Sequence, residues 1–544
     1  MVKRETQQKK EKEIFLISGF IGVITFIFLY GLKVLNPFYT DWLLGRGDLS
    51  QHYLGWEFYR KSQWFFPFGL TDQLAYPDKT SVIFTDSIPL LAVPFKLFRS
   101  ILPKNFQYFG WWGLACFFLQ GYFAAKILRA LNVNRVVCVI SSVFFSTAPV
   151  LLYRMYMHTS LGGQWLVLLS IYLYVQHDKQ YNRIGKTSLQ WGVIGFLIAA
   201  VHLYFLPMCG VFAGMYVFMS FIREKKFRVK YVVPLFTFVG ALLLNTYLLG
   251  GFSSSARTGS SGLGEFSFNL NGFVNPLGYS KLLPNLSQYH VCQSEGMAYL
   301  GIGMILLLIF AVVGYLWNKR LGAVKEIIGH ADYLFIAIVM ILFSASPIVT
   351  FGDKIVWNIS CPEKIWNYWE TFRSSGREIW GVYYLLMIAA IVGVTRCFQK
   401  RRGISALFVS LCVMIQIFDL SGVITSKHNS FWLEQTHELE LDSEVWELLS
   451  ERGYDHMVYA QEGIDLAKIF SLAEYTLEHD LTISNFYFAR TIEKDWNFDE
   501  QLNFPDKKSI YVVLGEKKAE MSTYSNLVWY EIDGFTVGVM EPLE

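Results

Sequence analysis

The chain has 544 residues and a formal net charge of +3, and 53% of its residues are hydrophobic while 17% are charged. A soluble protein averages about 45–50% apolar and about 25% charged residues, so this composition excludes an ordinary soluble protein of this length. The apolar residues form runs of the roughly 17–25 residues that a helix needs to cross a bilayer. We therefore expect a polytopic α-helical membrane protein with a soluble tail.

The first apolar run, residues 14–35, follows a basic and polar leader over residues 1–13. The run is longer than the ~7–15-residue core of a signal peptide and lacks a small-residue cleavage site. We expect a retained signal-anchor whose amino terminus is cytoplasmic. Ten further runs are predicted to span: 106–127, 136–152, 161–175, 189–204, 206–222, 231–250, 297–317, 333–351, 379–394 and 404–423.

The run 82–97 is doubtful because it contains two prolines and two charged residues, which are costly in a lipid-exposed helix. If it does not span, every short basic loop falls on the cytoplasmic side, as the positive-inside rule requires. The consistent topology has about eleven spans, with the carboxyl terminus outside and 82–97 lying at the outer surface. The basic loops are 126–135, 179–186, 223–230, 319–325 and 396–402.

This topology predicts a transmembrane domain over residues 14–423 and an external domain over residues 425–544. The tail has helical apolar spacing in two segments and strand patterns in the others, with a hairpin signal at Asp533–Gly534. We expect a small external α/β domain that docks substrate or caps the protein. The helices are predicted over 443–452 and 465–479, and the strands over 456–461, 481–490, 509–515 and 527–540. The large external loops are 36–105, 251–296 and 352–378.

The first external loop contains Asp41 and Asp48, followed by aromatic residues with helical spacing over 50–61. That spacing predicts a helix lying at the membrane interface. Asp48 stands at its first turn, where it either caps the helix or acts as a general base in a cavity. His52, one turn later, could orient that carboxylate or share a metal ion with it. Asp86 lies further along the loop and either caps a helix or faces a polar cavity.

The second and third loops offer further candidate residues. Residues 251–264 are rich in Gly and Ser, which indicates flexibility, but they lack the P-loop pattern. Glu295, at the mouth of the next span, either marks the interface or anchors a lid. Arg373 and Arg377 either anchor the chain at the interface or clamp a phosphate, which at headgroup depth belongs to a lipid.

Fainter candidates lie in the external turns. Arg154 and His158 share one turn and His202 lies at another, but a histidine near a helix end is more often a satisfied surface residue. Cys292 and Cys361 are both external in this topology. They could form a disulfide if the compartment is oxidising.

Three motifs resemble a known family. Residues 47–56 (Gly-Asp-Leu-Ser-Gln-His-Tyr-Leu-Gly-Trp), 76–91 (from Tyr-Pro-Asp to Thr-Asp-Ser-Ile-Pro-Leu-Leu) and 372–377 (Phe-Arg-Ser-Ser-Gly-Arg) carry the resemblance. They resemble a family of uncharacterised bacterial membrane proteins grouped with the GT-C superfamily. Members of that superfamily are integral-membrane glycosyltransferases that use polyprenyl-phosphate sugar donors. The resemblance covers the membrane part and, more weakly, the tail.

The resemblance implies that Asp48 is the catalytic base, with Asp41 or Asp86 as supporting acids. It also implies that Arg373 and Arg377 bind the donor phosphate. We expect further substrate contacts from His52, Tyr53 and Glu295. Some members have two adjacent acids, whereas Asp48 precedes Leu49 and Ser50. No metal ligand is therefore assigned, and a divalent cation stays an open alternative.

The expected reaction is inverting sugar transfer to a surface glycan, lipid or protein acceptor, with a base on the acceptor hydroxyl and cations on the phosphate leaving group. No nucleic-acid partner is expected. A transporter or flippase for a lipid-linked glycan or other solute is the main alternative, although no internal repeat supports it. A surface protein with a membrane anchor is less consistent with the sequence, because one span suffices for anchoring.

Overall fold

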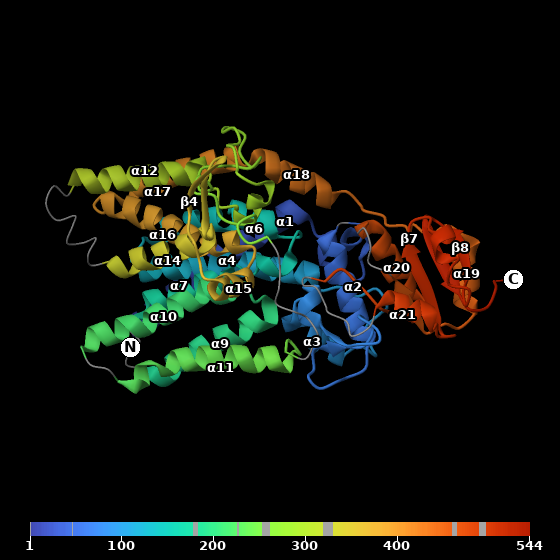
Figure 1. Ribbon diagram of the computed structural model, residues 1–544. Coiled ribbons are helices and arrows are strands. Elements are labelled where there is room, and N and C mark those ends of the chain that lie inside the picture. Colours follow the sequence, from blue (N-terminus) through green and yellow to red (C-terminus); the bar gives the residue numbers. More distant parts are fainter. Residues whose placement is uncertain are drawn as a thin grey trace. The chain divides into compact units, whose positions relative to one another are not determined.

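The computed structural model divides the chain into two compact units (Figure 1). The helical unit contains residues 1–36, 108–243 and 259–433, and the α/β unit contains residues 37–107, 244–258 and 434–544. The structure describes residues 2–45, 47–177, 183–225, 228–252, 262–318, 330–459, 465–488 and 497–543.

Each run predicted to span contains a helix, and these helices make up most of the helical unit. Within the described residues, six helical segments are long and apolar enough to cross a membrane, and four shorter apolar helices accompany them. The count of about eleven spans therefore remains a prediction. The helices are α1 (Val2–Tyr30), α4 (Phe109–Ala130), α5 (Arg135–Ser146), α6 (Pro149–Arg154), α7 (Trp165–Val175), α9 (Ile184–Val201), α10 (Phe205–Glu224), α11 (Val233–Leu248), α12 (Ile302–Asn318), α14 (Ala331–Ala345), α16 (Trp380–Cys397), α17 (Arg402–Asp419) and α18 (Ser421–Trp432).

Small residues let α1 and α4 pack backbone to backbone. A Cβ on Gly22 would lie 2.0 Å from the carbonyl oxygen of Phe117, and one on Gly121 would lie 2.2 Å from that of Ser18. Neither position has room for a side chain, so the close approach of the two helices depends on these glycines. Small residues serve the same purpose between helices in membranes generally.

The loops of the helical unit are held by buried amides. They contain η6 (Val291–Gly296), β3 (Ile348–Phe351), β4 (Lys354–Asn358), α15 (Glu363–Glu370) and η7 (Ser375–Ile379). Asn269 donates hydrogen bonds to Gln293 Oε1 (2.9 Å) and to the Gly352 carbonyl (2.8 Å), and Gln293 donates to Thr350 Oγ1 (2.7 Å). The second loop is thus tied to the β3–β4 hairpin from residue 262 onward. Most of its Gly- and Ser-rich stretch, residues 253–261, lies outside the described part of the chain.

The tail forms the sheet of the α/β unit, whose strand order is β6–β5–β7–β9–β8. β5 pairs in parallel with β6 and β7, whereas β9 pairs antiparallel with β7 and β8. Both predicted helices and the hairpin at Asp533–Gly534 are confirmed, while the strand predicted over 481–490 has only two residues, and residues 489–490 lie outside the described ones. The elements are α19 (Glu444–Glu451), β5 (His456–Tyr459), α20 (Leu466–Glu478), β6 (Thr482–Ile483), α21 (Phe498–Asn503), β7 (Ser509–Leu514), α22 (Lys518–Met521), β8 (Val528–Ile532) and β9 (Phe535–Val539).

The first loop predicted to be external belongs, from residue 37 onward, to the α/β unit. Its helix α2 (Asp48–Lys61) is predicted correctly, but every residue over 49–60 is buried. The expectation of an interfacial helix is therefore wrong, because the aromatic side chains pack inside the protein. A Cβ on Gly55 would lie 2.4 Å from Thr85 Cβ, so this glycine allows close packing against η3 (Val82–Thr85).

The remaining elements of this loop are short. They are η2 (Asp41–Leu43), β1 (Leu70–Thr71), β2 (Thr80–Ser81) and α3 (Pro89–Leu97), all in the α/β unit, whereas η1 (Lys33–Leu35) precedes the loop and belongs to the helical unit. The nine residues of α3 are too few to cross a bilayer, as we expected for 82–97. Residues 73–76 pair with Ile483 and so extend the sheet beside β6. All seven cysteines, including Cys292 and Cys361, are unpaired.

Candidate functional site

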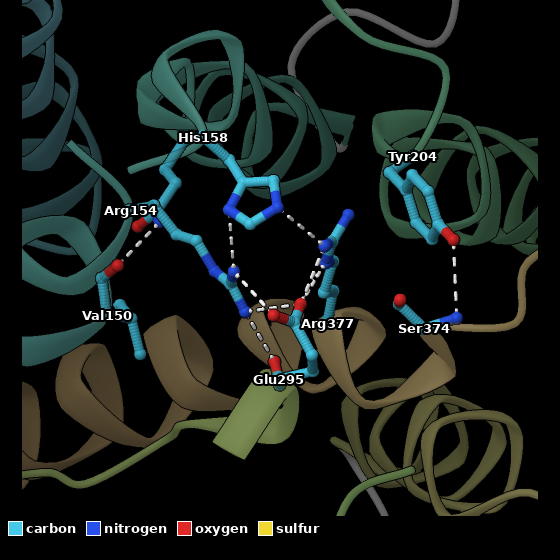
Figure 2. A network of polar contacts seen from close by, with 8 residues as sticks. Val150, Arg154, His158, Tyr204, Glu295, Ser374 and Arg377 are labelled. Carbon is cyan, nitrogen blue, oxygen red and sulfur yellow. Dashed lines mark hydrogen bonds and ion pairs between the residues drawn. The ribbon is translucent and has the colours of Figure 1, made fainter. Parts of the chain in front are cut away.

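A buried ionic cluster gathers at Glu295 in the helical unit (Figure 2). Arg154 donates to both carboxylate oxygens of Glu295, from Nη1 to Oε1 (3.1 Å) and from Nη2 to Oε2 (2.8 Å). Arg377 donates from Nε to Oε2 (2.7 Å). His158 lies between the guanidiniums, with Nδ1 3.3 Å from Arg154 Nη1 and Nε2 3.4 Å from Arg377 Nη2. Residues 154–158 and Arg377 therefore meet at the carboxylate of Glu295, although the three segments are far apart in sequence.

Two glycines allow η6 and η7 to approach closely enough for this contact. A Cβ on Gly376 would lie 2.8 Å from Gly296 Cα and 2.9 Å from the carbonyl oxygen of Phe266. The Gly376 amide also donates to that carbonyl (3.0 Å). Since Glu295 precedes one glycine and Arg377 follows the other, the close backbone approach places the carboxylate beside the guanidinium. The glycine next to each charged residue, Gly296 after Glu295 and Gly376 before Arg377, is therefore required for the two side chains to meet.

Aromatic rings and burial fix the two guanidiniums. The side chain of Arg154 is 0% exposed, and its guanidinium lies 4.5 Å from the Tyr153 ring centroid and 5.7 Å from that of Trp380. The guanidinium of Arg377 lies 4.7 Å from the Tyr204 ring centroid. Guanidinium planes stack favourably on aromatic faces. Both charges are therefore held in place and largely removed from water.

Electrostatics keeps Glu295 ionised. Burial alone would raise the pKa of the Glu295 carboxyl, but Arg377, Arg154 and His158 hold that pKa well below its ordinary value. Among the groups in direct contact, two guanidiniums face one carboxylate. Glu378 is also buried but forms no ion pair with either guanidinium. Guanidiniums held in this way are the kind of donor that binds anionic oxygens.

Arg373 and Arg377 have different environments although they are four residues apart. Arg377 begins the last turn before α16 and is committed to Glu295. Arg373 precedes η7, is exposed, and lies over the Phe266 ring at 5.3 Å. Within the described residues, Arg373 has no ion pair or hydrogen bond. It is therefore the arginine with donors available to an incoming ligand.

The predicted acids all lie in the α/β unit. Asp41 is the first residue of η2 and is half-buried. Asp48 is the first residue of α2, directly after Gly47, and is also half-buried. Asp86 is 9% exposed and has left-handed backbone geometry (φ 53°) at the end of η3. The arginines and Glu295 belong to the helical unit, so the predicted site residues come from both units.

His52 and Tyr53, the other residues predicted to contact substrate, lie in the core of the α/β unit. His52 is 0% exposed, and burial lowers its pKa to about 3, so the ring is neutral. Tyr53 is 6% exposed, and burial raises its pKa. In the described part of the chain, no group of three or more His, Cys, Asp or Glu side chains is placed to hold a metal ion.

Sequence reasoning missed a second buried ion pair, on α2. Glu57 Oε1 lies 3.1 Å from Arg60 Nη1, and Arg60 also donates to the carbonyls of Pro103 (2.7 Å) and Lys104 (3.0 Å). Burial raises the pKa of Glu57 to about 8, although Arg60 and Lys61 act to lower it. Glu57 and Arg60 are three residues apart in a helix rich in aromatic residues. In sequence, this spacing is the same as that of an ordinary surface ion pair.

This pair predicts a pH-dependent stability that Glu57→Gln removes. The folded state keeps the Glu57 proton up to about pH 8, whereas the unfolded chain releases it near the ordinary pKa of 4.5. The stabilisation is thus complete below pH 4.5 and is lost as the pH rises to 8. Wild-type unfolding free energy should fall between these values, by at most about 1.4 kcal/mol per pH unit. Melting curves should show a flatter profile for E57Q and an unchanged one for the exposed control E500Q.

The sequence signal for the Glu295 cluster was faint. Arg154 and His158 stand four apart beside an apolar run, which puts them on one side of a helical turn. Tyr204, whose hydroxyl accepts a hydrogen bond from the Ser374 amide (3.2 Å), had no distinguishing signal. The partners of Glu295 are 141 and 82 residues away in the chain.

The fold and the cluster define a multi-span helical membrane protein with a buried arginine–carboxylate site and an α/β unit. The chain belongs to the family described as a domain of unknown function, DUF6311, whose model matches residues 19–421. Residues 445–540 match the DUF6311 C-terminal domain. No curated protein matches the sequence.

Similar solved structures are oligosaccharyltransferases from Archaeoglobus fulgidus. One, AglB in complex with an inhibitory peptide and a dolichol-phosphate, has 9% identity and a TM-score of 0.47, with 98% of this chain and 74% of that chain covered. An apo form has 11% identity and a TM-score of 0.42, with coverage of 88% and 64%. A complex with Zn and sulfate has 11% identity and a TM-score of 0.41, with coverage of 96% and 73%. A likeness at this level assigns neither a superfamily nor an activity to this chain.

Proposed function

We propose that this protein transfers a sugar from a polyprenyl-phosphate donor to a glycan, lipid or protein acceptor at the outer face of a membrane. The observation that carries the proposal is the group of arginines at Glu295, with Arg154 and Arg377 fixed on the carboxylate and Arg373 exposed beside them in sequence. Arg154 and Arg377 stand at the ends of two helical segments that are long and apolar enough to cross a membrane. The phosphate available at that depth belongs to a lipid.

The arginines suit a phosphate leaving group. As the bond to the anomeric carbon breaks, negative charge grows on the phosphate oxygens, and fixed cations lower the barrier to that step. Arg373 has available donors, while Arg377 and Arg154 supply charge that Glu295 holds in a fixed position. Glu295 thus acts as a positioning residue for the cations rather than as a ligand of the sugar.

Asp48 is the proposed general base for the acceptor hydroxyl. A hydroxyl has a high pKa and must lose its proton as it attacks, which a carboxylate can accept. Asp48 is half-buried in the first turn of α2, where negatively charged side chains are favourable in helices generally. Direct displacement by the acceptor would invert the anomeric centre. Asp41 and Asp86 are proposed as supporting acids.

A flippase or transporter is the second candidate, because buried ionisable groups at helix ends also serve substrate pathways through membranes. The two candidates differ in where the lipid-linked sugar accumulates when the protein is absent. A missing transferase leaves donor on the outer leaflet, whereas a missing flippase leaves it on the inner leaflet.

The test is lipid-linked sugar profiling in a deletion strain of the organism that encodes the chain. We expect accumulated polyprenyl-phosphate sugar that an external, membrane-impermeant reagent can modify, together with an under-glycosylated surface polymer. Wild type and the exposed control K364Q should restore the polymer, whereas R373Q should not. An unchanged lipid profile with impaired solute uptake, or donor shielded from the external reagent, would refute the transferase.

A further inference from the structure

A cavity of about 740 Å³ lies among the ends of four helices in the helical unit. The end of α4 and the start of α5 form one wall, and the end of α16 and the start of α17 form the other. Three arginines line it: Arg129, Arg135 and Arg402. No acidic side chain is among its lining residues. The candidate glycosyl-transfer site contains none of these residues.

The cavity lies at the opposite end of α16 from the Glu295 cluster. Arg377 precedes the first residue of α16, and the cavity contacts Thr395 and Phe398 at its end. The 18 residues of α16 span roughly 27 Å, which is close to the thickness of the hydrocarbon core. The two sites are therefore about one membrane thickness apart. The basic turn 396–402 places the cavity on the side that the positive-inside rule predicts to be cytoplasmic.

The charges around the cavity do not cancel. Glu11 of α1 binds Arg129 through both carboxylate oxygens (2.7 and 2.8 Å) and also contacts Arg135 Nη2 (3.0 Å). One carboxylate thus serves two arginines. The third arginine, Arg402, has no ion pair or hydrogen bond within the described part of the chain. The amino termini of α5 and α17 add further positive potential at the cavity.

A buried donor in the wall also lacks a partner. Asn134 Oδ1 caps α5 by accepting a hydrogen bond from the Val137 amide (3.0 Å). Its Nδ2 is buried and has no hydrogen-bond partner among the residues that the structure describes. A buried amide donor without a partner costs free energy. The uncancelled charge of the arginines is therefore the feature that calls for an anion.

We propose that this cavity binds the phosphate headgroup of an anionic phospholipid from the leaflet opposite the Glu295 cluster. The arginines receive the phosphate oxygens. Val136 and Phe398 give the same cavity an apolar wall, which suits the beginning of an acyl chain better than a small soluble anion. The lipid would hold the ends of α4, α5, α16 and α17 together. This inference does not depend on the proposed transferase activity.

The test is native mass spectrometry of the purified full-length protein titrated with phosphatidylglycerol or phosphatidylcholine. Each surface arginine contributes about 1 kcal/mol to binding of anionic lipid, so R402Q should weaken phosphatidylglycerol binding about five-fold and R135Q/R402Q about 25-fold. The neighbouring control R401Q should match wild type, because Arg401 does not line the cavity. Melting temperatures should show that all variants are folded.

Three outcomes would overturn the proposal. Equal weakening by R401Q and R402Q would mean that the turn acts only through its net charge. Equal affinity for phosphatidylcholine would exclude selection of an anionic headgroup. Displacement of phosphatidylglycerol by millimolar inorganic phosphate would identify a soluble anion, and not a lipid, as the occupant.

Discussion

Replacing Glu295 with Gln should destabilise the protein by about 3–5 kcal/mol, because the change leaves two buried guanidiniums without their shared carboxylate. The side chains of Arg154 and Arg377 are 0% and 8% exposed, so water cannot replace the lost partner. The low pKa of Glu295 has the same origin. Its stabilisation is present above the unfolded pKa of about 4.5 and is lost as the pH falls through the lower folded pKa.

Thermal unfolding of the purified protein in detergent or nanodiscs measures this effect. The control is E265Q, since Glu265 lies in the same loop but is exposed. Combining E295Q with R154Q should cost less than the sum of the single changes, because the first replacement already removes the contact that the second would break. A melting temperature for E295Q equal to that of wild type would mean that the cluster contributes nothing to stability.

The helices of this chain were predictable because their signals are local. Apolar runs of membrane-spanning length identify the helices of the helical unit, and Asp533–Gly534 between two apolar strands identifies the hairpin of the tail. The left-handed backbone at both turn residues (φ 49° and 73°) is the conformation that this pair adopts most readily. Such features depend only on neighbours in sequence.

The position of α2 could not be predicted in the same way. Aromatic residues with helical spacing suit both a membrane interface and a protein core, and the pattern does not distinguish between them. In the structure, α2 is covered by a segment of the same unit that is distant in sequence. Gln51 donates to the carbonyl of Tyr487, 436 residues away, and Phe58 packs against Phe486. Burial by residues of the tail explains why α2 has so few exposed side chains.

The ionic cluster likewise depends on contacts between residues that are distant in sequence. The functional candidates Glu295, Arg373 and Arg377 are recognisable from residue type and from their place at the ends of apolar runs. The sharing of one carboxylate by Arg154 and Arg377 depends on the contact between Gly296 and Gly376, which no local pattern reveals. The different environments of Arg373 and Arg377 likewise follow from η7, which contains Arg377 and begins after Arg373.

Replacing Asp48 with Asn should lower sugar transfer by about 10²–10⁴-fold, the contribution typical of a general base, while the protein stays folded. Asn has nearly the same shape but cannot accept the acceptor's proton. The change also removes a charge from the first turn of α2, which costs only about 0.3–1 kcal/mol of stability. Transfer is measured on purified protein with a polyprenyl-phosphate sugar, with D442N, in an exposed part of the same unit, as the control.

A second replacement checks catalysis against the electrostatic support of α2. Asp48 follows the N-cap Gly47, so it can support the helix only through its charge in the first turn, and Ser, which is not a base near neutral pH, removes that charge as Asn does. If Asp48 serves as the base, Asp48→Ser should melt close to wild type and yet transfer as poorly as Asp48→Asn. If Asp48 only stabilises α2 through its charge, Asp48→Ser and Asp48→Asn should both lose about 0.3–1 kcal/mol of stability and keep full activity. Full activity in either variant would leave the role of base to Asp41 or Asp86, whose Asn variants can be assayed in the same way.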